Sequence, residues 1–158
     1  MKKTTPHWIA IAILSLTLTA LIGFLFIGST QSMDDGRTAI YLSSGDRDRV
    51  LTEMRALLVA TQEVVKGLAE DDLKTVEKAA LNVGSQAIST ADMKLAPKLP
   101  KGFKTLGFGT HEAFDEISKM AREGKKPQEI QLKLVNTMNN CIACHASYRL
   151  PEKLQSKD

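Results

Sequence analysis

The chain has 158 residues and carries 21 Lys and Arg against 18 Asp and Glu, a formal net charge of +3 at neutral pH. No stretch of it is rich in Lys or Arg, so the composition argues against nucleic acid as a partner. The sequence has two cysteines, and both lie in one short motif near the C-terminus. That placement leaves no cysteine pair for a structural disulfide elsewhere in the fold.

An uncharged apolar run extends from Trp8 to Ile27 near the N-terminus. Its length matches the ~20 residues that an α-helix needs to cross the hydrocarbon core of a bilayer. A cleaved signal peptide usually has a shorter apolar run and an A-x-A-like site, which this segment lacks. Lys2 and Lys3 before the run, with acidic residues after it, predict a cytoplasmic N-terminus. We therefore expect residues 1–28 to be a membrane anchor, with a cleaved signal as the alternative, and the remainder to be exported.

Residues 29–45 are expected to be a linker, and residues 46–158 a single domain. Apolar residues recur with a helical period in four segments, which predicts helices at about 46–69, 72–88, 103–122 and 127–150. The stretch 89–102 contains two prolines and a glycine and predicts a loop. Short connections join the other helices. The sequence therefore predicts an all-α fold, an antiparallel up-down-up-down four-helix bundle.

The last predicted helix carries a C-x-x-C-H motif formed by Cys141, Cys144 and His145. This motif is the attachment signature of c-type haem. Two thiols three positions apart lie on one helical turn, where each can add to a haem vinyl group. The imidazole that follows can bind the iron from the same side of the ring. We therefore expect one haem c per chain, with Cys141 and Cys144 as covalent anchors and His145 as the proximal iron ligand.

The same cysteine spacing also occurs in thioredoxin-like redox sites and in zinc sites. A redox site of that kind would be expected near a βαβ pattern, and a closed zinc site would need a second pair of ligands. The sequence around the motif predicts no strands, and the chain has no further cysteine. A haem-free helical domain that uses its two thiols for redox exchange or metal binding is therefore a third hypothesis, behind two haem-based ones.

The ending CIACHASYR, from Cys141 to Arg149, resembles the C-x-A-C-H-x-x-Y-R ending of the class II c-type cytochromes, the family of cytochrome c′ and its low-spin relatives. The resemblance covers about residues 46–150, and it implies a four-helix bundle with the haem motif on the last helix. It also implies that Cys141 and Cys144 form thioethers, that His145 is the proximal ligand, and that Arg149 lies beside the proximal haem face. The other interpretation of Arg149 is a solvated charge in the last helical turn.

The resemblance further implies that the residue at the sixth iron position decides the function. Family members with a Met on the first helix are six-coordinate electron carriers, whereas those with an apolar residue there are five-coordinate and bind gases such as nitric oxide. In an up-down bundle the first helix begins level with the end of the last. At 1.5 Å per residue, Leu51 and Met54 then stand near the level of His145. Met54 is the only Met on the inward stripe of that helix, which makes it the candidate distal ligand.

Other candidates for the distal side stay open. Met54 could instead be flexible core filler, with Leu51 covering an open distal face. His111 lies at the right level too, although a lone helical His is more often a surface or satisfied core residue. Met93 falls in the predicted loop and is a further candidate. Met138 is excluded because it lies on the proximal side.

We expect a monohaem c-type cytochrome that carries single electrons on the periplasmic side of the inner membrane, to which its N-terminal helix anchors it. The alternative location is a soluble periplasmic form after signal cleavage, and the alternative function is a five-coordinate cytochrome c′ that binds small gases. The expected partners are the membrane and redox proteins of an electron-transport chain, and the resemblance also admits a homodimer. The sequence presents no nucleophile or general base, so we do not expect an enzyme.

Overall fold

The computed structural model describes residues 7–27 and 30–152, without the side chains of residues 24–27. Most of the described residues are helical, which confirms the predicted all-α fold in its coarse form. The helices are α1 His7–Ile27, α2 Ser44–Ala69, α3 Leu73–Leu81, α4 Thr90–Leu95, α5 Lys101–Arg122 and α6 Pro127–Ser147. Single 3-10 turns occur at η1 Ser85–Ala87 and η2 Ala96–Lys98. Three short strands, which the sequence did not predict, are β1 Thr30–Ser32, β2 Thr38–Ile40 and β3 Tyr148–Arg149.

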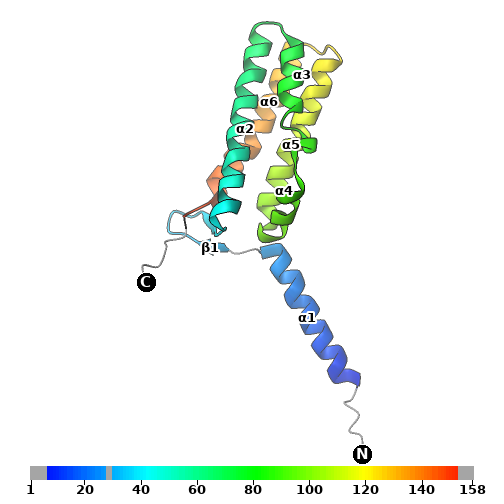
Figure 1. The fold of residues 1–158 in the computed structure, drawn as a ribbon, viewed down its shortest axis with the longest axis vertical. Coiled ribbons are helices and arrows are strands. Elements are labelled where there is room, and N and C mark those ends of the chain that lie inside the picture. The colour runs from blue at the N-terminus through cyan, green and yellow to red at the C-terminus, as the bar shows by residue number, and fades with distance from the viewer. Residues whose placement is uncertain (1–6, 28–29, 153–158) are drawn as a thin grey trace, which may run out of the picture.

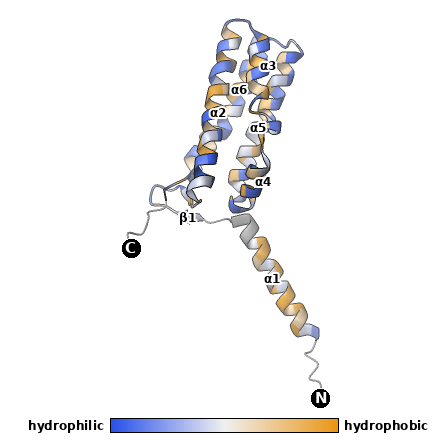
Figure 2. Cartoon of the chain, viewed as in Figure 1, coloured by the Kyte–Doolittle hydropathy of each residue, from blue (hydrophilic) through white to orange (hydrophobic). Residues whose placement is uncertain are grey.

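Helix α1 is apolar around its whole circumference and extends away from the other helices (Figures 1 and 2). Its large side chains, such as Trp8, Leu14 and Leu16, are exposed. Within the described part of the chain, no helix is long and apolar enough to cross a membrane. Lys2 and Lys3, on which the predicted orientation depends, lie outside the described residues. The membrane anchor therefore stays a prediction.

Four helices, α2, α3, α5 and α6, lie side by side and run alternately up and down in Figure 1. Helix α2 packs against α3, α3 against α5 and α5 against α6, and α2 also contacts α6. The side chain of Ser43 caps α2, that of Asp72 caps α3, and Pro127 begins α6, each a residue type favoured at its position. Gly124, with a φ of 68°, makes the turn after α5. These local signals place the helix starts close to the predicted ones.

Helix α3 is shorter than the predicted helix at 72–88. It ends at Leu81, and the chain then bends at Gly84, where an added Cβ would collide with the carboxylate of Asp115 on α5. The same carboxylate accepts a hydrogen bond from the backbone N–H of Ser85 at 3.0 Å. The close approach of α5 therefore ends α3 about two turns early, a tertiary effect that local periodicity does not contain.

The segment predicted as a loop, 89–102, contains helix α4 and turn η2. Ser89 and Asp92 form a capping box that closes the start of α4, and this reciprocal pairing satisfies two backbone donors that would otherwise lack partners. Leu95 and Leu99 from this segment are buried. The proline-rich stretch therefore has regular structure and contributes side chains to the core of the domain.

The domain has two separate apolar cores. The upper core is enclosed by α2, α3, α5 and α6, and its largest fully buried side chains are Phe114, Ile117, Ile130, Val64 and Val76. The lower core lies at the other end, and its buried members are Ile40, Leu42, Val50, Leu95, Leu99 and Phe103. Four partly buried side chains complete the lower core, namely Met54, Cys144, Tyr148 and Leu150. The lower core thus includes a cysteine of the predicted haem motif.

A small three-stranded sheet closes the lower end of the domain. Strand β1 pairs antiparallel with β2, and β2 pairs parallel with β3, with Thr38 opposite Tyr148 and Ala39 opposite Arg149. The segment expected as a linker at 29–45 therefore contains two strands, and it supplies Ile40 to the lower core. The pairing brings residues near the two ends of the chain into contact beside the end of α6.

Candidate cofactor site at the end of helix α6

The three residues of the C-x-x-C-H motif lie in the last two turns of α6. Cys141 is exposed, Cys144 is partly buried, and both thiols are free. His145 is exposed in the final turn, where a basic side chain is favoured by the helix dipole. The helix therefore presents two thiols and an imidazole on adjacent turns, and the two thiols are not joined in a disulfide.

The surroundings of the thiols keep them protonated. Burial raises the pKa of Cys141, and burial together with the neighbouring Cys141 thiol raises the pKa of Cys144 to about 11. Reactive dithiols depend on a lowered pKa, commonly at a helix N-terminus, whereas this pair lies at a helix C-terminus. The site therefore lacks the electrostatics of a disulfide-exchange centre.

The structure brings Met54 to the same end of the domain as the motif. Met54 and Cys144 are both partly buried members of the lower core. Leu51, one turn earlier on α2, is also partly buried. Phe103 and Tyr148 stack edge to face in this core, with ring centroids 5.6 Å apart. The thioether of Met54 and the thiol of Cys144 therefore share one apolar environment.

Apolar side chains remain exposed along the line where α2 meets α6. We call these residues the α2–α6 seam, and they are Leu58, Val65, Val135, Met138 and Ile142. Leu58 is 69% exposed and Ile142 is 65% exposed, and both are large enough to be buried in most small domains. An exposed apolar surface of this kind marks a place where a further apolar group can bind.

The α2 side of the seam follows from helix geometry. Gly67 lies against α3, because a Cβ added there would approach Cγ2 of Val76 to 2.8 Å. Leu58 lies nine residues before Gly67, about two and a half turns, and so faces the opposite way. Leu58 is therefore directed away from α3, on a helix that also contacts α6.

The same reasoning orients the α6 side of the seam. The side-chain nitrogen of Asn140 lies 3.7 Å from a Cβ added at Gly109 of α5, so Asn140 faces α5. Met138 and Ile142 lie two residues before and after Asn140, each rotated by more than half a turn. Both side chains therefore face away from α5, toward α2. The apolar surfaces of α2 and α6 adjoin one another beside the motif.

These residues fit a covalently attached, largely apolar ring such as haem. The donor set comprises two free thiols and one exposed imidazole, the thioether of Met54 lies in the same core, and the adjoining surface is apolar. Among the described residues, no group of three or more His, Cys, Asp and Glu side chains is arranged to hold a metal ion by itself.

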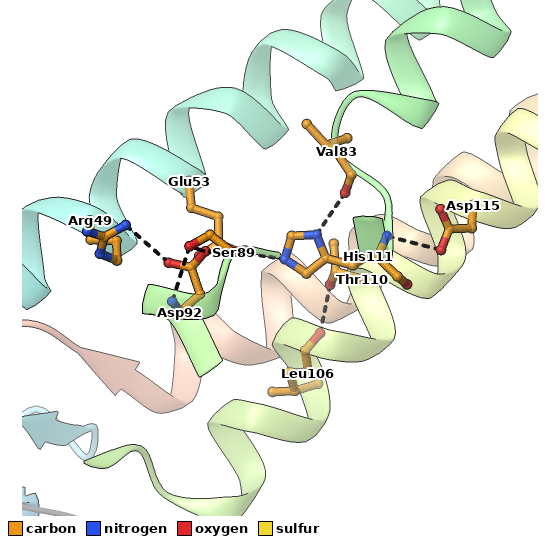
Figure 3. Close-up of polar contacts among 10 residues, drawn as sticks. Arg49, Glu53, Val83, Ser89, Asp92, Leu106, Thr110, His111 and Asp115 are labelled. Atoms are coloured by element: carbon orange, nitrogen blue, oxygen red, sulfur yellow. Dashed lines mark hydrogen bonds and ion pairs between the residues drawn. The ribbon is translucent and has the colours of Figure 1, made fainter. Parts of the chain in front are cut away.

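His111 occupies a different position from the one expected of an iron ligand. It is buried in α5, and its Nδ1 lies 2.7 Å from the carbonyl oxygen of Val83 while its Nε2 lies 2.6 Å from Oε1 of Glu53 (Figure 3). Both ring nitrogens are therefore engaged. Burial alone would lower the pKa of His111, but the hydrogen bonds to Glu53 and Val83 outweigh it and raise the pKa above 6.5.

Met93 is a solvent-exposed side chain. It is 56% exposed on α4 and does not belong to the lower core that contains Cys144. Of the distal candidates named from the sequence, Met54 and Leu51 are the two that lie on α2 at the level of this core.

Arg149 does not lie in a helical turn, because α6 ends at Ser147 and Arg149 belongs to strand β3. The interpretation of Arg149 as a charge in the last helical turn is therefore wrong. Its Nη1 lies 3.5 Å from Oδ2 of Asp35 in the hairpin. The role of Arg149 at the proximal haem face stays a prediction.

Arg47 is a neighbour of the site whose contacts the sequence did not predict. Its Nε donates a hydrogen bond to the carbonyl oxygen of Leu150 at 3.0 Å, and its Nη1 lies 3.7 Å from Oε1 of Glu152. Arg47 and Arg149 both line an open cleft of about 730 Å³ between the hairpin and the C-terminal strand. No signal in the sequence predicted this cleft, because it depends on the unpredicted pairing of β2 with β3.

Searches against protein families, curated proteins and solved structures found no match for this chain.

The raised pKa of His111 predicts a dependence of stability on pH. A folded-state pKa above 6.5 means that the protonated imidazole stabilises the fold, fully below about pH 6.5 and less as the pH rises through the folded-state pKa. We expect the melting temperature to fall in that window above pH 6.5. Circular dichroism melts between about pH 5 and pH 9 would measure it. In His111→Gln, which retains the exposed His145, most of this fall should vanish; equal falls in both proteins would contradict the assignment.

Proposed function

We propose that this chain is a class II c-type cytochrome that carries single electrons on the exported side of a membrane. One haem c per chain is held by thioethers to Cys141 and Cys144, and His145 is its proximal iron ligand. The observation that supports the proposal is the meeting of a free C-x-x-C-H motif on the last helix with Met54 in one apolar core. When bound, the haem supplies a one-electron iron couple.

The residues of the chain would act on the cofactor in three ways. The two thioethers fix the ring to α6, so that His145, the next residue, is held at the iron on the proximal side. Met54 offers a thioether from α2, and a Met/His pair favours the ferrous state and raises the reduction potential. Buried side chains such as Val50 and Phe103 exclude water from this end of the domain, which also tunes the potential.

The alternative function is that of a five-coordinate cytochrome c′ that binds small gases such as nitric oxide. The observation that favours it is the placement of Leu51, which lies one turn before Met54 on α2 and is equally only partly buried. If Leu51 rather than Met54 faces the iron, the distal side has no protein ligand. Determining the spin state of the iron separates the two functions.

We propose that α1 anchors the domain to the inner membrane with the haem domain in the periplasm, and that its partners are redox proteins of an electron-transport chain. The uniformly apolar surface of α1 supports this location. Electrons would pass between the haem and its partner proteins at the surface beside the seam, because Ile142, which lies within the motif, is exposed there. The proposed role is that of an electron carrier and not of an enzyme.

Replacement of both thiols, Cys141→Ala with Cys144→Ala, should abolish covalent haem because the chain has no other cysteine. Haem staining on a denaturing gel, together with intact mass, measures the attachment. As a matched control, either single replacement leaves one thiol and should retain haem through one thioether. Haem that survives denaturation in the double variant would contradict the proposed attachment.

Met54→Leu should convert a low-spin spectrum into a high-spin, carbon-monoxide-reactive one and lower the reduction potential, if the Met54 sulfur binds iron. As packing alone, the change conserves volume and should cost less than ~1.5 kcal/mol of stability. Absorption spectra with and without carbon monoxide measure the effect. Met138→Leu is the matched control on α6 and should leave the spectrum unchanged. An unchanged spectrum in Met54→Leu would exclude Met54 as the ligand.

The mature protein should fractionate with membranes and resist release by high salt, because the apolar run from Trp8 to Ile27 is about the length of a bilayer span. Sedimentation of washed membranes followed by N-terminal sequencing measures this. Recovery of a soluble form that begins between residues 29 and 33 would show that the segment is a cleaved signal instead.

A further inference from the structure

His111 connects three segments of the domain through a single side chain. Its imidazole lies on α5, Val83 lies in the turn after α3, and Glu53 lies on α2 (Figure 3). The ring is 4% exposed, so water does not compete for either nitrogen. The bridge crosses the domain between the upper and lower cores.

Both partners of the imidazole are hydrogen-bond acceptors. The Val83 carbonyl can only accept, and an ionised Glu53 carboxylate can only accept, so the arrangement is complete when His111 carries both protons. Hydrogen bonds between charged groups are shorter and more directional than neutral ones, in keeping with the distances of 2.7 and 2.6 Å. A bridge of this kind fixes the orientation of the bonded groups as well as the distance between them.

Glu53 is directly followed by Met54 on α2. Because a helix turns as a rigid unit at 3.6 residues per turn, a contact that fixes Glu53 toward α5 also fixes the direction of Met54. Met54 then lies against the lower core with Cys144. Rotation of α2 by even part of a turn would carry the sulfur away from that core.

Apolar packing against α2 is incomplete beside Glu53. A cavity of about 60 Å³ lies beside Glu53 and is lined by Val50, Leu99, Phe103 and His111 among others. The tight approach of α2 to α3 is at Gly67, near the opposite end of the helix. Arg47, in the first turn of α2, donates a hydrogen bond to the carbonyl oxygen of Leu150, more than a turn before Glu53. The contacts from Arg49 to Asp92 and from Lys98 to Asp46 involve exposed cations, and such pairs contribute little.

We propose that His111 is a positioning residue for the distal side of the haem: through Glu53 it holds α2 in the rotation that directs the Met54 sulfur at the iron. This inference rests on the proposed function, and specifically on Met54 as the sixth ligand. It differs from a merely structural role for a buried histidine, because a structural role affects stability and leaves the iron ligands in place.

The test uses the haem-loaded protein and three variants of the bridge. Glu53→Ala and His111→Gln should each lose part or all of the sulfur–iron absorption band, show a mixed-spin spectrum and have a lower midpoint potential, while far-ultraviolet circular dichroism stays helical. Glu53→Gln retains an acceptor for the imidazole N–H and should keep the band. Unchanged bands and potentials in Glu53→Ala and His111→Gln would overturn the inference.

Thr110→Val is the matched control. Thr110 is the neighbour of His111 on α5 and is similarly buried, and among the described residues its hydroxyl donates to the Leu106 carbonyl of its own helix at 2.7 Å and not to another helix. Its replacement should keep the band, and a loss equal to that of Glu53→Ala would show general loosening and overturn the inference. If Glu53→Ala does not fold, the double variant Glu53→Leu with His111→Leu leaves no unpaired buried charge and is expected to lose the band; retention would overturn the inference.

The wild-type protein separates this inference from the proposed function. A high-spin wild type with covalent haem would overturn the positioning role of His111 and favour the gas-binding alternative, while the proposed haem attachment would stand. A wild type without covalent haem would overturn the proposed function and the inference together. A low-spin wild type whose band is lost in Glu53→Ala and kept in Glu53→Gln would support both.

Discussion

The parallel pairing of β3 with β2 holds the end of α6 against the beginning of α2. Residues 148 and 149 pair with residues 38 and 39, and Arg47 at the start of α2 binds the carbonyl oxygen of Leu150. Without these contacts the last turns of α6 would fray, as helix ends do where their carbonyls lack partners. The placement of the C-x-x-C-H motif opposite α2 depends on this junction.

The two cores of the domain differ in how closely they are packed. The upper core is built from fully buried aliphatic and aromatic side chains such as Phe114 and Ile130 and has the character of an ordinary packed interior. The lower core mixes buried residues with partly buried Met54 and Cys144 and adjoins the exposed seam. The upper half of the domain is thus closely packed, and the lower half is where we propose that the cofactor is attached.

The parts of the fold that sequence could predict are those with local causes. Helices α2, α5 and α6 have long 3.6-residue stripes and clear end signals, and their bounds agree with the predicted ones to within a few residues. The level of Met54 relative to the motif followed from helix rise alone. The prediction of a haem motif needs only the local spacing of three residues. The placement of all three residues on one helix follows from that spacing.

The parts that sequence could not predict depend on distant residues. Strands of two or three residues are too short to show a period, so the hairpin and its pairing with β3 gave no signal. Helix α3 ends early because Asp115, 30 residues away in the chain, accepts a hydrogen bond from the backbone N–H of Ser85. The partner of His111 is 58 residues away on another helix. Each of these contacts is set by tertiary packing.

The sheet also imposes an order on folding. Strand β2 belongs to the first part of the domain to be synthesised and β3 to the last, so their pairing closes a loop that contains nearly the whole domain. Closing so long a loop costs chain entropy before any contact compensates for it, and non-local pairings of this kind form slowly. The helices of the upper core, with their local contacts, can assemble first. The lower end is then the last to close, so the thiols of α6 stay accessible for the proposed attachment of haem while the rest of the domain is already folded.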